Sequence, residues 1–120
     1  MARILVVDDT PANLALAGKL LTAAGHETLL AESASAGIAL ATGELPDLIL
    51  MDLGLPDMDG TQALTALRAN PRTAQLRIVA FTAFAMPAER DRALAAGFDG
   101  YLSKPIRFAT FAGDVAGLLA

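Results

Sequence analysis

Short apolar runs alternate with longer amphipathic segments along the whole chain. The short runs carry few charges, which is typical of buried strands. They predict strands over residues 3–7, 26–31, 48–51, 77–81 and 100–102. The longer segments are rich in Ala and Leu at helical spacing. They predict helices over residues 11–24, 34–42, 61–69 and 87–96, and a last helix with Phe108, Phe111, Val115 and Leu118 on one face.

Cap and turn residues mark the ends of these helices. Pro11 suits the first turn of a helix, and Ser33 predicts an N-cap. Gly43 predicts the end of the second helix. The segment 54–60 is dense in turn residues, and we interpret its Asp57 and Asp59 as turn and cap residues rather than ligands.

Strict alternation of strands and helices predicts a parallel sheet covered on both faces. The runs 4–7, 48–51 and 78–81 are apolar throughout, so we expect their strands at the centre of the sheet. The other two runs are more polar and should form the edges. The fold class is therefore α/β: a single doubly wound, flavodoxin-like (βα)5 domain. Its five-stranded parallel sheet has the order 2-1-3-4-5, with a crevice between strands one and three.

Composition narrows the function classes. The 120 residues, 54% of them hydrophobic, suit one domain over residues 1–120, and we expect no output domain in this chain. The absence of Cys excludes disulfides and thiolate metal sites. A net charge of −4 with scattered basic residues argues against direct binding to nucleic acid or to an anionic membrane. No apolar run approaches the roughly 20 residues that span a bilayer, and we expect a cytoplasmic protein.

Chemically active side chains follow the strands at the points where the strands end. Asp8 and Asp9 follow the first strand, Asp52 the third, Thr82 the fourth and Lys104 the fifth. Because parallel strands present their carboxyl ends at one edge of a sheet, we expect these groups to converge. Three carboxylates repel one another unless a cation lies between them. Oxygen ligands, with no Cys and one distant His, favour Mg²⁺ over zinc or copper.

Asp52 has a particular place in this arrangement. With a cation beside it, a carboxylate oxygen can attack a phosphoryl group and form an acyl phosphate. Lys104 would offset further negative charge, and the Thr82 hydroxyl could donate to a phosphoryl oxygen. The residues alone thus predict a phosphoacceptor site.

Four motifs carry a family resemblance over essentially the whole chain. They are VVDD at 6–9, DLILMDLGLPDMDG at 47–60, FTA at 81–83 and YLSKPI at 101–106. With these motifs the chain resembles a CheY-like response-regulator receiver domain of two-component and phosphorelay signalling. The resemblance implies a switch that accepts a phosphoryl group from a phosphohistidine of a sensor kinase or a histidine phosphotransfer protein. Such a domain catalyses only its own phosphorylation and dephosphorylation, so we do not expect an enzyme in the usual sense.

The resemblance also implies roles for the metal-binding residues. Asp52 would be the phosphoryl acceptor. Asp9 and Asp52 would bind Mg²⁺ directly together with the backbone carbonyl of Gly54, and Asp8 would act through water.

Further implied roles lie near the carboxyl end of the chain. Thr82 and Lys104 would contact the phosphoryl group, and the bond from Lys104 to Pro105 is expected to be cis. Tyr101 matches the aromatic residue that moves inward when Thr82 shifts. The surface of helix 4, strand 5 and helix 5, roughly residues 87–119, would bind a downstream protein target. We expect a monomer or a weak dimer.

Two further observations refine this interpretation. Phe84 lies two residues after Thr82 and is large and apolar, and we hypothesise that it shields the acyl phosphate from water. The TPAN stretch at 10–13 resembles receivers of hybrid kinases and stand-alone phosphorelay regulators. A receiver cut from a hybrid histidine kinase or another multidomain regulator therefore remains an alternative.

Three other classes fit less well. A Mg²⁺-dependent phosphohydrolase typically has an Asp-x-Asp motif, whereas Asp52 is followed by Leu-Gly-Leu. A flavin or nucleotide binder needs a phosphate-cradling loop after the first strand, and here that loop is acidic. A pseudo-receiver that only binds a partner would not need the complete set of acids, Thr and Lys.

Overall fold

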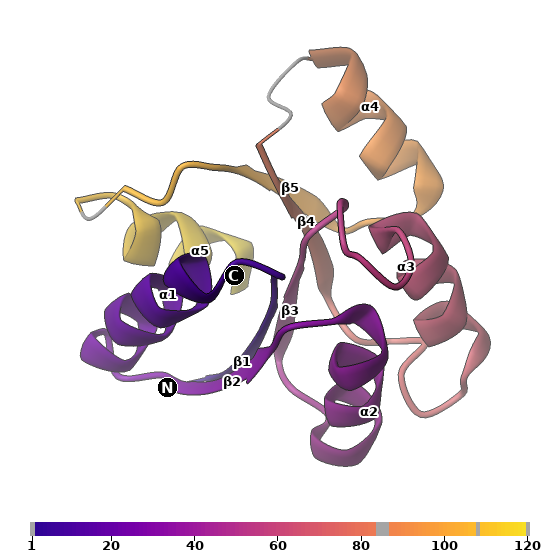
Figure 1. Ribbon diagram of the computed structural model, residues 1–120, viewed down its shortest axis with the longest axis horizontal. Coiled ribbons are helices and arrows are strands. Elements are labelled where there is room, and N and C mark those ends of the chain that lie inside the picture. The colour runs from indigo at the N-terminus through magenta and orange to yellow at the C-terminus, as the bar shows by residue number, and fades with distance from the viewer. Residues whose placement is uncertain (1, 84–86, 108, 120) are drawn as a thin grey trace.

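A five-stranded parallel sheet forms the centre of the computed structural model, and helices lie on both sides of it (Figure 1). The structure describes residues 2–83, 87–107 and 109–119. The strands are β1 (Arg3–Val7), β2 (Glu27–Ala31), β3 (Leu48–Met51), β4 (Ile78–Thr82) and β5 (Gly100–Ser103). The helices are α1 (Pro11–Ala23), α2 (Ala34–Glu44), α3 (Gly60–Ala69), α4 (Pro87–Ala96) and α5 (Phe111–Leu119).

The strand order is β2-β1-β3-β4-β5, which confirms the predicted doubly wound topology. Burial along the strands explains this order. β3 and β4 are buried at every residue and β1 at all but its first. β2 and β5 stay partly exposed along most of their length, because each pairs with a neighbour on one side only. The strands that contain the apolar runs are therefore central, as their composition predicts.

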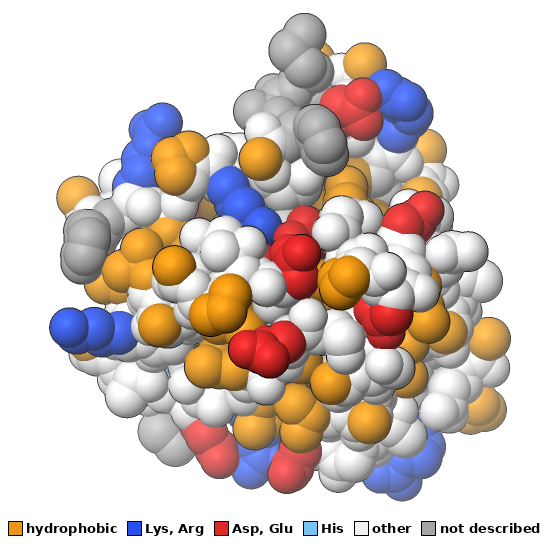
Figure 2. Space-filling model, in the orientation of Figure 1, with side chains coloured by type: hydrophobic (Ala, Val, Ile, Leu, Met, Phe, Trp, Pro, Cys, Tyr) orange, Lys and Arg blue, Asp and Glu red, His pale blue; other side chains and the backbone are white. Residues whose placement is uncertain are grey.

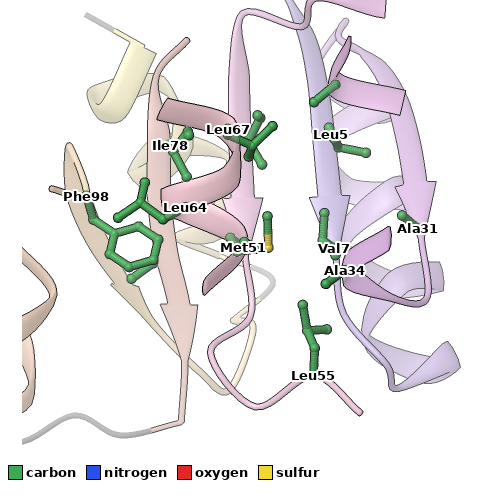
Figure 3. Close-up of a cluster of buried hydrophobic side chains, with 14 of the residues drawn as sticks. Leu5, Val7, Ala31, Ala34, Met51, Leu55, Leu64, Leu67, Ile78 and Phe98 are labelled. Carbon is green, nitrogen blue, oxygen red and sulfur yellow. The ribbon is translucent and has the colours of Figure 1, made fainter. Parts of the chain in front are cut away.

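Alternate residues of each strand point to opposite faces of the sheet and build two cores. In β1, Leu5 and Val7 pack with residues of α2, α3 and α4, whereas Ile4 and Val6 pack with residues of α1 and α5. Figure 3 shows part of the first core, where Leu64 and Phe98 lie over β4. The α1–α5 layer and the α2–α3–α4 layer lie on opposite sides of the sheet in Figure 1.

The end of α2 differs from the prediction. The helix passes through Gly43 and ends at Glu44, and Leu45 adopts a left-handed conformation with φ 48°. The Leu45 N–H donates to the carbonyl of Ala41 at 3.0 Å. Pro46 gives the physical reason, because a residue that precedes proline is sterically kept out of the right-handed helical region. The helix therefore ends where proline requires it rather than at the glycine.

The last helix begins at Phe111, and Phe111 and Val115 are buried on the predicted face. Phe108, predicted on the same face, lies outside the described residues, as does Phe84. Within the described ranges, every helix is too short or too polar to cross a lipid bilayer.

Candidate functional site

Asp8, Asp9 and Asp52 lie together where β1 and β3 end. The two strands pair in parallel with Val7 opposite Met51, so the residues that follow them start side by side. The Asp52 N–H donates to the Val7 carbonyl at 3.0 Å, which extends this pairing by one bond. Each acid offers a carboxylate oxygen, and these oxygens lie within 4.8 Å of one another. Three closely placed carboxylates suit a hard divalent cation.

The two adjacent acids have different surroundings. Asp8 is fully buried, while Asp9 is exposed. The Asp8 Oδ1 accepts the Thr10 N–H at 2.8 Å, and its Oδ2 accepts the Asn13 side-chain amide at 3.3 Å. The first turn of α1 therefore holds Asp8 in place. Sequence reasoning missed this contact of Asn13, which only the folded first turn brings to Asp8.

Lys104 reaches into the acid cluster from the end of β5. Its backbone N–H donates to the Thr82 carbonyl at 2.8 Å, which fixes the backbone of Lys104 beside the end of β4. The Lys104 Nζ lies 2.6 Å from Asp8 Oδ2 and 3.1 Å from Asp52 Oδ2. The ammonium also lies 5.0 Å from the centre of the Phe81 ring, within the range of a cation–π contact. The side chain is thus held by two carboxylates and one aromatic face.

The charge of Lys104 is stabilised by these neighbours. Burial by itself lowers the pKa of the ammonium, but the hydrogen bonds and charges of Asp8 and Asp52 outweigh it, so the pKa is raised above 10.5. The peptide bond from Lys104 to Pro105 is cis. Three carboxylates and one ammonium leave two negative charges at the site. A divalent cation would balance them.

The loop after β3 returns closely on the backbone of Asp52. The Gly54 N–H donates to Asp52 Oδ1 at 3.0 Å, and the Gly60 N–H donates to the Leu53 carbonyl at 3.0 Å. A Cβ added at Gly60 would lie 2.6 Å from the Asp52 carbonyl oxygen. Glycine is therefore required at residue 60 for α3 to start this close to Asp52, a role that the sequence pattern alone did not indicate.

Thr82 is buried as the last residue of β4, so the structure places it at the same sheet edge as the acids. Tyr101 lies apart from them. It packs partly buried against the α2–α3–α4 core, and its hydroxyl has no hydrogen-bond partner among the described residues. Burial, and then the charge of Glu89, raise the pKa of Tyr101 above 10.0.

The molecular surface shows the same concentration of charge. In Figure 2, acidic side chains gather near the middle of the face, next to a basic side chain. A separate open groove of about 470 Å³ lies over β5 between α4 and α5. Its walls are formed by Arg90, Tyr101, Leu102, Ser103, Asp114 and Leu118.

Known proteins are similar to this chain in both sequence and fold. A family model described as the response regulator receiver domain matches residues 4–115. The sensor protein GacS of Pseudomonas syringae pv. syringae is 45% identical over 107 residues, which are 87% of this chain and 12% of that protein. The chain thus spans about an eighth of the length of this relative.

Shorter relatives match along most of their length. The polar-differentiation response regulator DivK of Brucella ovis is 34% identical over 108 residues, which are 90% of this chain and 88% of that one. The solved structure of the chemotaxis response regulator CheY4 of Vibrio cholerae superposes with a TM-score of 0.91 at 26% identity, covering 98% of both chains.

Proposed function

We propose, from the premise that this chain belongs to the response regulator receiver domain family, that Asp52 is its phosphoacceptor. The observation that carries the proposal is the position of the Asp52 carboxylate. One oxygen accepts the Gly54 N–H and the other accepts the ammonium of Lys104, while two further acids lie beside it. A carboxylate held in this way at the crevice of the sheet suits nucleophilic attack on phosphorus.

The proposed reaction begins with a phosphohistidine of a sensor kinase or a histidine phosphotransfer protein. An oxygen of Asp52 attacks the phosphorus, a P–O bond forms and the P–N bond breaks. The electron pair of that bond returns to the ring nitrogen, and the histidine leaves as neutral imidazole when its other nitrogen carries a proton. In the second half of the cycle, a water oxygen attacks the phosphorus and the P–O bond to Asp52 breaks, which restores the carboxylate and releases inorganic phosphate and a proton.

The surrounding residues would each lower the cost of bringing a phosphoryl group to an acidic site. Lys104 would turn part of its ammonium contact from Asp8 and Asp52 toward a phosphoryl oxygen. The Thr82 hydroxyl would donate to another phosphoryl oxygen. The bonds from Thr10 and Asn13 would keep Asp8 fixed while the charges around it change.

The cofactor in this proposal is Mg²⁺, whose ligand preference matches the acid cluster. Asp9, Asp52 and the carbonyl of Gly54 would be its direct ligands, and Asp8 would act through water. When bound there, Mg²⁺ would neutralise charge on the phosphoryl oxygens and on the attacking carboxylate.

The groove between α4 and α5 supports the proposed partner surface. Tyr101 lines it from β5, so a change in the position of this ring would alter the shape of the groove. Arg90 and Asp114 provide charges of both signs at its walls. We propose that a downstream protein binds here, with an affinity that depends on the state of Asp52.

Intact-mass measurement after incubation with acetyl phosphate tests the proposal. We expect the wild-type protein to gain one phosphoryl group only when Mg²⁺ is present, and Asp52→Asn to gain none. Asp59→Asn is the matched control, because Asp59 lies in the same loop and its carboxylate accepts hydrogen bonds from the Thr61 and Gln62 N–H groups, where it caps α3. It should be phosphorylated like the wild type.

A second donor makes a negative result decisive. If folded wild-type protein takes no phosphoryl group from acetyl phosphate or from a panel of phosphorylated histidine phosphotransfer proteins, Asp52 is not a phosphoacceptor. Equal labelling of the wild type and Asp52→Asn would also reject the assignment of this residue.

A further inference from the structure

Asp57 links the loop that follows Asp52 to a helix elsewhere in the chain. Its Oδ1 accepts the Ala34 N–H at 2.9 Å. Its Oδ2 accepts both the N–H and the hydroxyl of Ser35, each at 2.9 Å. These donors belong to the first turn of α2, so one carboxylate makes three hydrogen bonds across more than 20 residues of sequence.

Helix α2 already has a cap of its own. The Ser33 side chain accepts the Ala36 N–H at 3.2 Å, as an N-cap residue normally does. Asp57 binds the two N–H groups of the first turn that Ser33 leaves to other acceptors. The Ser33 cap accepts from the helix itself, so the three bonds of Asp57 are the polar link between the loop and α2.

The same loop is anchored on both sides of Asp57. Leu55 is only 7% exposed and belongs to the core that contains Val7 and Ala34. Figure 3 shows its side chain pointing toward these two residues. At the other end, Gly60 closes the loop through its bond to the Leu53 carbonyl. The main chain between Asp52 and Leu55 is therefore a short span between fixed points.

Gly54 lies within this span and has no side chain to hold it. Its position next to the acceptor depends on the bond from its N–H to Asp52 Oδ1 and on the anchors of the loop. A Cβ built at Gly54 would have only Asp52 Oδ1 within 4.0 Å. Packing around Gly54 therefore does little to fix its backbone, and anchoring elsewhere in the loop must do so.

We propose that Asp57 is a positioning residue for the phosphoacceptor: by fastening loop 53–59 to the first turn of α2, it holds the backbone of Gly54 beside Asp52 and thereby increases the affinity of the site for Mg²⁺. The part concerning Mg²⁺ rests on the proposed function. The fastening of the loop is independent of it and can be measured in protein without metal.

The hydrogen bonds between Asp57 and the first turn of α2, here called the clamp, persist at neutral pH. The backbone N–H groups of Ser35 and Ala34 lower the pKa of Asp57 to about 2, so the carboxylate stays ionised and keeps accepting. It therefore acts as a fixed element of the site rather than as a switch.

Asp57→Ala and Ser33→Ala form the matched pair that tests this proposal. Both remove a cap of α2, but only the first releases the loop. Two readouts are compared: hydrogen exchange of the Gly54 amide by NMR in protein without metal, and the Mg²⁺ dissociation constant by titration calorimetry. For Asp57→Ala we expect faster exchange at Gly54 and Mg²⁺ affinity about tenfold lower, the low end for residues that orient metal ligands. Ser33→Ala should change neither.

The outcomes separate the two levels of the proposal. If Asp57→Ala leaves Gly54 exchange and Mg²⁺ affinity like those of Ser33→Ala, Asp57 is only a helix cap and the inference is wrong. If the wild type binds no Mg²⁺, the proposed cofactor fails, and Gly54 exchange still decides whether the clamp exists. Asp57→Asn keeps one acceptor oxygen, should give intermediate values, and serves in place of the alanine variant should that variant not fold.

Discussion

The ammonium of Lys104 lies closer to Asp8 than to the proposed phosphoacceptor. Its Nζ is 2.6 Å from Asp8 Oδ2, compared with 3.1 Å from Asp52 Oδ2. The Asp8 side chain is fully buried and that of Lys104 is 13% exposed, so water screens this pair poorly. The lysine is thus a built-in counter-ion for the acid cluster, and any metal ion that binds there must share the carboxylates with it.

Replacing Lys104 by Met removes this charge and keeps the apolar stem. We expect Lys104→Met to lower the free energy of unfolding by about 3 kcal/mol without divalent ions, at the low end for a broken buried pair because the ammonium is partly exposed. Added Mg²⁺ should restore part of the loss and bind more tightly than to the wild type. Urea unfolding with and without Mg²⁺ measures both effects. The control is Lys19→Met, which replaces the other, exposed lysine and should change the free energy of unfolding little. An equal loss in both variants would contradict the pairing of Lys104 with the acids.

Gly60→Ala should destabilise the protein although alanine favours helices. The new Cβ would lie 2.6 Å from the Asp52 carbonyl oxygen and 2.9 Å from the Leu53 Cα, and the backbone would have to move. We expect a loss of about 1–3 kcal/mol, the usual range for overpacking, with slower phosphorylation because Asp52 is displaced.

Gly43→Ala is the matched control for this prediction. Gly43 lies inside α2 and a Cβ there would have nothing within 4 Å, so alanine should raise the free energy of unfolding by about 0.5–1 kcal/mol. Chemical denaturation of both variants tests whether the two signs are opposite. Stabilisation by Gly60→Ala would show that the loop is not closely packed on Asp52.

Tyr101 is the single tyrosine and the chain has no tryptophan, so its ionisation can be followed by absorbance without interference. Burial and the charge of Glu89 raise its pKa in the folded state above 10.0. The neutral ring therefore contributes stability below pH 10.0, and this contribution is lost as the pH rises through the folded pKa. A spectrophotometric titration should give a higher midpoint for native protein than for protein in urea. Glu89→Gln should lower the native midpoint slightly, and coincident native and unfolded curves would be inconsistent with the buried position.

Asp57 gives the opposite dependence on pH. Its pKa falls from 3.8 to about 2 on folding, so its stabilising effect is present above pH 3.8 and is lost as the pH falls toward 2. The difference in unfolding free energy between the wild type and Asp57→Asn should therefore shrink over this interval. Ser33→Ala removes a cap that does not titrate, so its difference from the wild type should stay constant. A constant difference for Asp57→Asn as well would show that the carboxylate charge does not matter.

The sheet order could be predicted because the central, buried strands are more apolar than the edge strands. LILM at β3 and IVAFT at β4 contain no charged residue, whereas β2 begins with Glu27 and its first four residues remain partly or fully exposed. The strand-end rule then sufficed to bring Asp8, Asp9 and Asp52 to one edge, since it needs only the topology.

Contacts that depend on the meeting of distant segments could not be predicted. Asp59 caps the helix that follows it, which a local pattern reveals. Asp57 caps a helix that precedes it by more than 20 residues, and neither segment carries a sign of the other. The end of α2 differs from the prediction for a local reason, because Pro46 keeps Leu45 out of the right-handed helical region, whereas the helix accommodates Gly43.

The sharp difference in exposure between Asp8 and Asp9 has a wider consequence. Asp8 faces inward and is engaged by Lys104 and the first turn of α1, while Asp9 faces solvent and has no such partner among the described residues. A strand end with one acid could either anchor the lysine or offer an open oxygen to an incoming ion. Two consecutive acids separate these tasks, and it is the direction of the backbone, rather than the chemistry of the side chains, that assigns them. Inserting or deleting one residue in β1 would move both acids by one position, so only one carboxylate would remain at these two positions and one of the two tasks would be lost.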